Sequence, residues 1–351
     1  MWLRRYVDKA ERFLLEPKHL LLLQFLWVLP YLFLSNYLER SLLPFRLVCY
    51  TEPELLQVQR PIRMDRRECI RYFFPDRPSI PRSECEFNQR VRTLLRPPSY
   101  KLHGINRVMV IRSAPSAYAY REYIRETWKL HVEEQMPVIF VSGTDHWNMT
   151  DEHLEHGDIL QFDFVESYQN LTLKMMSIYR FVLEETSAEQ IVVINDDTIV
   201  NSTALFNVCE NQAVQSRGDT TSDYILGKVS RGYPRLIFPW LPWYVSSTVY
   251  PHKCYPPFVQ GSSFVISKHA AAKILRHICE FPFVHLDDVM MGIVSNCLDI
   301  RNVHRDGFDQ HTLDEFTVFH YQYSRFTTKQ MRDSFTLIRH TISTTPSSRT
   351  I

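Results

Sequence analysis

Glycine is scarce in this 351-residue sequence, which contains only nine. Neither GxGxxG nor GxxxxGK[ST] occurs, so the glycine-rich loops that cradle phosphates in many nucleotide-binding folds are excluded. The sequence also lacks an excess of charge of one sign, because 40 Lys and Arg face 39 Asp and Glu. Without a basic field, nucleic acid is excluded as the main partner. There is no internal repeat, and no CxxC or Cys/His spacing typical of zinc sites.

One long apolar run is present near the N-terminus. No charged residue occurs from His19 to Leu38, and about 20 residues at 1.5 Å per residue span about 30 Å, the thickness of a bilayer core. A cleaved signal peptide is the alternative, but its apolar region is shorter and ends in small residues that are missing here. Basic residues are more numerous before the run than after it, which places the N-terminus in the cytosol. We expect a cytoplasmic tail over 1–18, a transmembrane signal anchor over 19–38 and a lumenal remainder.

Seven cysteines and three N-x-[ST] sequons agree with a lumenal chain. Most of the cysteines should pair in an oxidising compartment, and their odd number leaves one over. We expect Cys49, the nearest to the membrane, to be that one, either free or bridging a dimer. Cys69 and Cys85 could close a small loop. The sequons give candidate glycosylation sites at Asn148, Asn170 and Asn201.

The segment over 39–100 is rich in proline. Eight prolines punctuate it and arginines crowd between them, which excludes a long regular element. We expect a solvated lumenal stem here, and a binding patch formed by the arginines is the alternative.

The rest of the chain alternates short apolar runs with segments of helical spacing. Such alternation indicates an α/β fold with a mostly parallel sheet. We therefore expect one domain over 101–330, followed by a C-terminal tail over 331–351. The expected strands are 108–111, 137–141 and 191–194, and the expected helices lie around 121–134 and over 171–185.

Two acidic clusters carry the candidate chemistry. Asp196 and Asp197 directly follow an apolar strand, and the carboxyl ends of strands border the ligand crevice in open α/β sheets. Carboxylates there can hold Mg²⁺ or Mn²⁺ against substrate phosphates, whereas a turn or an N-cap is the alternative. Asp287 and Asp288 precede a helix-like apolar run, for which helix capping is the alternative. His320, between two aromatic residues, fits either a ligand or a packed core residue.

Five short motifs follow one another in a specific order. They are REYIRETW at 121–128, GDIL with DF and YQNLTLK within 157–174, NDD at 195–197, WYVS with YPPF and a glycine within 243–261, and DDV..G at 287–292. On these residues the sequence resembles the β-1,3-galactosyltransferase family (glycosyltransferase family 31) over about 107–325. Asn195 stands where the family has Asp, and Val259-Gln260 where it often has Cys-Ser. Asp287 and Glu166 are conservative replacements.

The resemblance implies a GT-A-like nucleotide-sugar-binding domain in a Golgi type II membrane protein. Such a domain transfers a hexose with inversion from a UDP-sugar to a glycan hydroxyl of a glycoprotein or glycolipid, forming a β-1,3 linkage. Galactose is the favoured sugar, with N-acetylhexosamine as the other choice.

The resemblance also implies roles for individual residues. Asp197, with His320 as second ligand, would hold Mn²⁺ or Mg²⁺, which neutralises charge on the UDP leaving group. Asp288 would be the general base for the acceptor hydroxyl. The remaining candidates are Asp196, Arg121, Arg125 and Lys174 for the uridine or diphosphate, and Trp243, Tyr244, Asp287 and Gly261 for the sugars. Structural ion pairs are the alternative for the basic residues, and core packing for the aromatic ones.

Other functions are left open by the sequence. A catalytically inactive relative would bind glycans or assist a partner transferase, and Asn195 motivates it by removing one negative charge from the expected metal site. A metal-dependent hydrolase would release sugar or phosphate without an acceptor product. A membrane-anchored adhesion module explains the anchor and the sequons but not the ordered acidic motifs. A homodimer is left open as well.

Overall fold

The computed structural model describes residues 49, 64–75, 85, 87, 91–216, 223–236, 239, 241, 243–321 and 325–344. The expected cytoplasmic tail and transmembrane anchor lie outside these residues. Among the described residues, no helix combines the length and the apolar character needed to cross a membrane.

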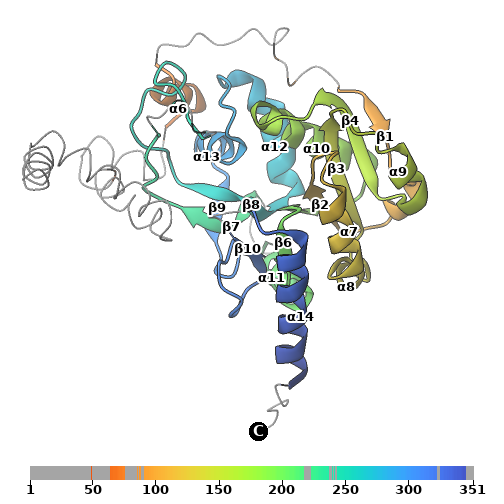
Figure 1. The fold of residues 1–351 in the computed structure, drawn as a ribbon. Helices are drawn as coiled ribbons and strands as arrows, with labels where there is room; N and C mark the ends of the chain where they lie inside the picture. The colour runs from red at the N-terminus through yellow and green to blue at the C-terminus, as the bar shows by residue number, and fades with distance from the viewer. Residues whose placement is uncertain are drawn as a thin grey trace, which may run out of the picture.

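Two sheets form the centre of the described part of the chain (Figure 1). The strands are β1 (Thr93–Leu95), β2 (Arg107–Arg112), β3 (Val138–Thr144), β4 (Ile159–Val165), β5 (Gln190–Asn195), β6 (Thr198–Val200), β7 (Tyr224–Ser230), β8 (Phe258–Ser267), β9 (Arg301–His304) and β10 (Val318–His320). The larger sheet has the order β1-β4-β3-β2-β5-β8-β7-β9, and β10 pairs with β6 in the smaller one. The strands β4-β3-β2-β5 and the pair β7-β9 are parallel, whereas β8 runs antiparallel to both of its neighbours. The expected α/β fold with a mostly parallel sheet is thus confirmed.

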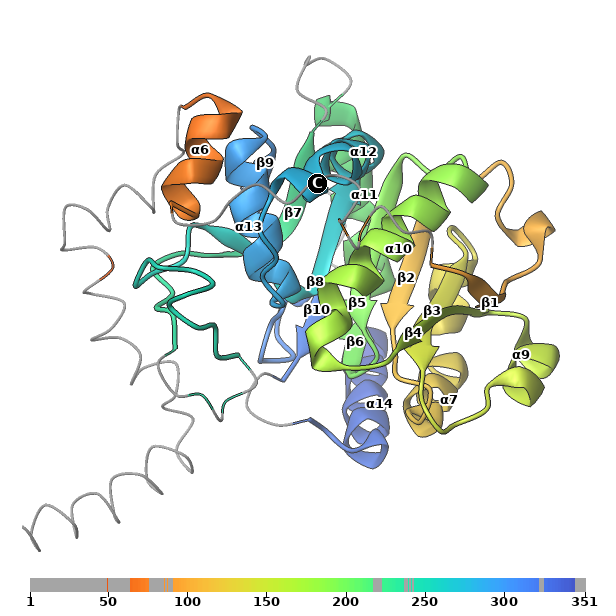
Figure 2. The ribbon, with the colours of Figure 1, turned by 90° about the horizontal axis from the view of Figure 1, so that it is seen from above.

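Helices cover both faces of the larger sheet, as Figures 1 and 2 show. One face carries α6 (Arg66–Phe73), α10 (Leu171–Glu185), α12 (Lys268–His277) and α13 (Asp287–Cys297). The other carries α7 (Tyr118–Glu126), α8 (Lys129–Glu133), α11 (Ser202–Ser216) and α14 (Thr328–Thr344). The shorter elements are α9 (Thr150–His156) and the 3₁₀ turns η3 (Ser99–Lys101), η4 (Tyr168–Asn170) and η5 (Ile278–Glu280).

The central strands are apolar on both sides because both faces of the sheet are covered. In β2, Val108 and Val110 join the core under α10, α12 and α13, whereas Met109 and Ile111 join the core on the other face. Such strands give continuous apolar runs, and the three strands expected from those runs are confirmed as parts of β2, β3 and β5. The expected helix over 171–185 coincides with α10, whereas the one around 121–134 is divided into α7 and α8.

Three long-range disulfides join the N-terminal part of the chain to the domain, and they correct the expectations for the cysteines. They link Cys49 to Cys254, Cys69 to Cys297 and Cys85 to Cys279. Cys49 is therefore neither free nor available to bridge a dimer, and Cys69 and Cys85 do not close a loop together. The unpaired cysteine is Cys209, buried in α11.

Part of the expected stem packs on the domain. In α6, Cys69 and Phe73 are fully buried, and the adjoining Phe74 is nearly so. The helix contacts α13, to which Cys69 is bonded. Further along, β1 pairs with β4 at the edge of the larger sheet. Among the described residues of this segment, Cys69, Phe73 and Phe74 thus belong to the core and not to a solvated spacer.

Candidate functional site

The first acidic cluster lies where the central strands end. β2 and β5 run parallel and in register, so that their last residues, Arg112 and Asn195, are paired. Asp196 and Asp197 then form a tight turn into β6. The hydroxyl of Thr198 donates to the carbonyl of Asn195 across the turn (2.8 Å). Both carboxylates therefore emerge at the carboxyl edge of the parallel strands, where ligands bind in open α/β sheets.

Asp196 is buried between two partners. Its carboxylate accepts a hydrogen bond from the hydroxyl of Ser113 (2.8 Å) and one from Nη2 of Arg325 (2.6 Å). The guanidinium of Arg325 also lies over the ring of Tyr120, 4.0 Å from its centroid. Burial raises the pKa of Asp196, and the charge of Arg325 opposes that rise.

Asp197 faces His320, which the pairing of β10 with β6 brings to the turn. Nε2 of His320 lies 3.6 Å from Oδ1 of Asp197, and its Nδ1–H donates to Asp309 (2.7 Å). Burial works against charge on both partners. The neighbouring His320 outweighs burial and lowers the pKa of Asp197, while the two carboxylates raise the pKa of His320 to about 9. His320 therefore lies between two carboxylates and is not packed only among aromatic rings.

This arrangement fits a hard cation that is held by few protein ligands. Oδ1 of Asp197 is buried and has no hydrogen-bond partner. Because Nδ1 of His320 is bonded to Asp309, Nε2 is the nitrogen turned towards Asp197, as in histidines whose second nitrogen is oriented for a metal by a carboxylate. No group of three or more His, Cys, Asp or Glu side chains in the described ranges is arranged to hold a metal ion. Two protein ligands suffice where substrate phosphates and waters supply the others.

The second acidic cluster begins α13. Both carboxylates lie in the first turn of the helix, where the helix dipole favours negative charge. Arg112 donates to Asp287 in a short, buried ion pair. Burial, followed by the charge of Asp287, raises the pKa of Asp288 to about 7. Asp288 thus has the proton affinity of a general base that works near neutral pH.

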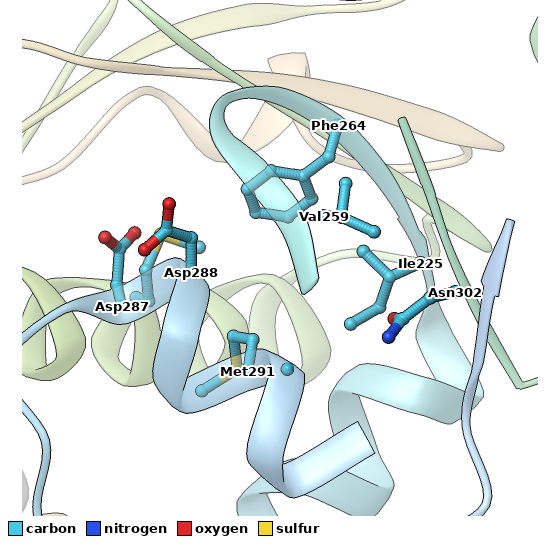
Figure 3. Close-up of a pocket in the computed structure, with 9 residues that line it drawn as sticks. Ile225, Val259, Phe264, Asp287, Asp288, Met291 and Asn302 are labelled. Atoms are coloured by element: carbon cyan, nitrogen blue, oxygen red, sulfur yellow. The ribbon is translucent and has the colours of Figure 1, made fainter. Parts of the chain in front are cut away.

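A pocket adjoins these two carboxylates. Figure 3 shows Asp287 and Asp288 on one side of it and Val259, Ile225 and Asn302 on the other. Gly261 lies beside Asp288, because a Cβ added at this glycine would be 3.4 Å from the Cβ of Asp288, at the limit of van der Waals contact.

The three basic candidates for the uridine or diphosphate are engaged with protein groups. Arg121 is fully buried and donates to both carboxylate oxygens of Glu152 (2.7 Å each). Arg125 donates to Asp158 (2.8 and 3.0 Å), and Nζ of Lys174 to both oxygens of Glu166 (2.9 Å each). These are the contacts of structural ion pairs, and the donor-binding roles of Arg121, Arg125 and Lys174 stay predictions.

Aromatic residues form an exposed rim on the Asp288 side. Trp243 is 51% exposed and Tyr168 is 40% exposed. Burial, followed by the nearby charge of Asp288, raises the pKa of Tyr168, and Trp243 opposes that rise. Tyr244 is half-buried beside Trp243. An exposed Trp–Tyr pair next to a carboxylate is suited to the face of a sugar ring, and core packing does not account for Trp243.

The sequon residues differ in their surroundings. Asn148 is exposed, and its carbonyl oxygen accepts from the backbone of Thr150. The Nδ2 of Asn170, which would carry a glycan, donates to the carbonyl of Val165 (2.8 Å). Asn201 accepts from Ala204 at the start of α11. Packing therefore competes with modification most directly at Asn170.

The sequence did not single out four residues of the site, which are Arg112, Ser113, Asp309 and Arg325. Arg112 carried a signal, because a charged residue ending an apolar strand is seldom buried without a specific partner. Asp309 lies in a loop with a positive φ of 49° and carried none.

Comparison with known proteins identifies the family. The Galactosyltransferase family profile matches residues 119–306, which include both acidic clusters. The chain belongs to the galactosyltransferase family. It is 26% identical over 236 residues to lactosylceramide 1,3-N-acetyl-beta-D-glucosaminyltransferase A of Xenopus laevis, covering 62% of this chain and 61% of that protein. It is 28% identical over 202 residues to beta-1,3-galactosyltransferase 5 of Homo sapiens, covering 55% of this chain and 64% of that protein.

The match therefore spans somewhat less than two thirds of these family members. A solved structure, that of the galactosyltransferase LgtC with donor and acceptor sugar analogs, aligns with 68% of this chain and 97% of its own. Its sequence identity is 8% and its TM-score 0.32, a similarity too weak to add to the family assignment.

Proposed function

We propose that the protein is a metal-dependent glycosyltransferase that moves a hexose from a UDP-sugar to a glycan hydroxyl with inversion. Galactose is the favoured sugar and N-acetylhexosamine the other choice, since one or two pocket contacts discriminate between them. The linkage is β-1,3, and the acceptor is a glycan of a glycoprotein or glycolipid. Family membership and the activities stated in the names of the two relatives support this proposal.

The observation that carries the proposal is the placement of Asp288. Its carboxyl group is held beside a pocket and next to exposed aromatic rings, and its pKa is raised to about 7. A single-displacement transfer needs one base to take the proton from the acceptor hydroxyl as the new bond forms. Asp288 can accept this proton near neutral pH, and Trp243 can place the acceptor ring beside it.

The other half of the reaction is the departure of UDP. Asp197 and His320 would hold the divalent cation, which supplies positive charge to the leaving diphosphate. Asp309 fixes the ring of His320, and Arg325 adds a second positive charge next to Asp196. The GT-A-like character of the domain is part of the same proposal.

The location of the protein is proposed from its sequence. The apolar run over 19–38 would anchor it as a type II Golgi membrane protein with its domain in the lumen, which agrees with the three disulfides. The sequons would carry glycans there. Because Cys49 is paired with Cys254, a homodimer would have to form without a disulfide from Cys49.

The test uses the full chain purified from a eukaryotic secretory host. It is incubated with Mn²⁺, each UDP-sugar in turn and a panel of glycan acceptors, and both UDP and glycan products are measured. Asp288→Asn and Asp197→Ala should lose transfer. Asp163→Asn is the matched control, because its carboxylate is 48% exposed on β4 and pairs only at the surface with Arg92.

The outcomes separate the alternatives. A glycan product that is lost in both site variants and kept in Asp163→Asn supports the transferase and names its donor. UDP binding without a product from any donor contradicts it and favours the non-catalytic relative. Release of free sugar without a glycan product indicates a hydrolase.

A further inference from the structure

Arg112 connects the two acidic clusters although it belongs to none of the sequence motifs. It ends β2, and its side chain is only 8% exposed. Its guanidinium donates to Asp287, to the carbonyl of Gly261 and to the side chain of Asn195. One buried cation thus joins the end of β5, the crevice end of β8 and the start of α13.

Asn195 is turned towards this cation. Its Oδ1 accepts from Nη2 (2.7 Å) and Nε (3.2 Å) of Arg112, its neighbour in the parallel pairing of β2 with β5. The hydrogen bonds that the structure shows for the side chain of Asn195 both come from Arg112, and neither involves Asp197 or His320. The carboxylate that Asn195 replaces would therefore have added its negative charge next to Arg112. An amide oxygen accepts the same hydrogen bonds as a carboxylate but carries no charge.

The contacts of Arg112 reach Asp288 from two sides. Asp287, its carboxylate partner, is the neighbour of Asp288 in α13 and the charge that raises the pKa of Asp288 most after burial. Gly261, whose carbonyl Arg112 holds, lies so close to Asp288 that a Cβ added at the glycine would be 3.4 Å from the Cβ of Asp288, and its backbone lowers the pKa of that carboxyl group. Moving the guanidinium or neutralising its charge therefore changes both the position and the charge around Asp288.

We propose that Arg112 is a positioning residue that holds Asp287 and Gly261 around Asp288, and that Asn195 is the uncharged acceptor that keeps the charge of Arg112 committed to Asp287. This inference rests on the proposed function, in which Asp288 is the base. It assigns Asn195 to the surroundings of Asp288, where the acceptor would bind. The carboxylate that is absent at position 195 is therefore not a ligand lost from Asp197 and His320.

A carboxylate at position 195 would share the guanidinium with Asp287. One more negative charge would then act on Asp288 and raise its pKa. Four other titratable groups face Asp288 or the Asp287–Arg112 pair, and they are unchanged in every variant. They are Tyr168 from η4, Lys174 and Tyr179 from α10, and Tyr255 before β8. A change in titration between variants can therefore be assigned to residues 112 and 195.

The experiment measures the titration of Asp288 without any substrate. The full chain is labelled with carboxyl-¹³C aspartate, and the resonance of Asp288 is identified by its loss in Asp288→Asn. In Asn195→Asp the titration midpoint should rise by about one pH unit, which is a tenfold change in the ionised fraction. Asn195→Ser, which adds no charge, should leave it near the wild-type value.

Variants of the arginine test the positioning role. Arg112→Gln should raise the titration midpoint of Asp288, as Asn195→Asp does. Arg112→Lys keeps the charge, so its midpoint should be near the wild-type value while its kcat stays low. Arg107→Lys is the matched control, because Arg107 begins the same strand, is similarly buried (13% exposed) and binds Glu210 and Gln190 instead of a residue of the site. It should change neither the midpoint nor kcat. If Asn195→Asp does not fold, Arg112→Gln and Arg112→Lys still give the comparison.

The rate measurements must follow the titration. In Asn195→Asp the acidic limb of the kcat/KM profile should move with the carboxyl midpoint, while the Kd for UDP with Mn²⁺ stays within about twofold. An unchanged midpoint in Asn195→Asp and Arg112→Gln overturns the inference, as does a loss of UDP affinity in Asn195→Asp. Failure of the proposed function looks different from failure of this inference. In that case the wild-type protein transfers no sugar, while the titration of Asp288 still tests the roles of Arg112 and Asn195.

Discussion

Replacing Arg121 with alanine distinguishes a donor-binding arginine from a structural one. The guanidinium is fully buried and its partner Glu152 is 6% exposed, with two contacts of 2.7 Å between them. The same guanidinium donates to the carbonyls of Ala114 and Pro115 in the loop after β2. Its removal leaves a carboxylate and two carbonyls without their donor.

The size of the effect follows from the burial of the pair. Removing one partner of a buried ion pair costs about 3–5 kcal/mol. Nη1 of Arg125 remains 2.9 Å from Glu152 and keeps part of its compensation. We therefore expect the lower end of the range, about 3 kcal/mol, which lowers Tm by about 6–12 °C in a domain of this size.

The assay is thermal unfolding of Arg121→Ala beside Arg96→Ala, with the Kd for UDP measured on the folded variants. Arg96 pairs with Glu185 at 2.5 Å, but its side chain is 42% exposed, so its loss should cost less than about 1 kcal/mol. The structural role predicts a large fall in Tm for Arg121→Ala and a Kd for UDP within about threefold of wild type. An unchanged Tm with a Kd more than about tenfold higher would refute this reasoning and make Arg121 a donor contact.

Three further predictions test other parts of the structure. Since Asp288 must be ionised to accept a proton and its pKa is raised to about 7, kcat/KM should rise through neutral pH and level off above it; a flat profile from about pH 5.5 to 8.5 would contradict its role as base. Gly292→Ala would place a Cβ 2.5 Å from the Cβ of Phe258, and should cost about 1–3 kcal/mol in thermal unfolding with no change in UDP affinity. Cys69→Ala opens a bridge between residues separated by 228 positions, and should cost about 2–5 kcal/mol; unfolding unchanged from wild type would mean that α6 is held by packing alone.

The parts of the fold that could be predicted are those in which local pattern and burial agree. β2, β3 and β5 are buried on both faces, so each is a continuous apolar run in the sequence. β8 was missed because the crevice end of the strand carries Gln260, Gly261 and Ser262. Gly261 and Ser262 bind Arg112 and Asp309 of the site, and the polar character that serves the site hides the strand.

The candidate site was predictable where its residues follow strand ends or begin a helix. Asp196, Asp197 and Asp288 are of this kind. Arg112 and Asp309 were not predictable, because their roles depend on contacts across 83 to 175 positions in the chain or on a loop of unusual backbone. The disulfide pairing could not be predicted for a similar reason, since partners 194 to 228 residues apart leave no local pattern.

The central claim is a single displacement on a UDP-sugar with Asp288 as the base, and the anomeric configuration of the product tests it most directly. The sugar is linked to UDP in the α configuration, so one displacement gives a β-linked product. Proton NMR of the glycan made by the wild-type protein should show a new β-anomeric signal, which is missing from the Asp288→Asn reaction. An α-linked product, or a β-linked product formed equally fast by Asp288→Asn, would contradict the account.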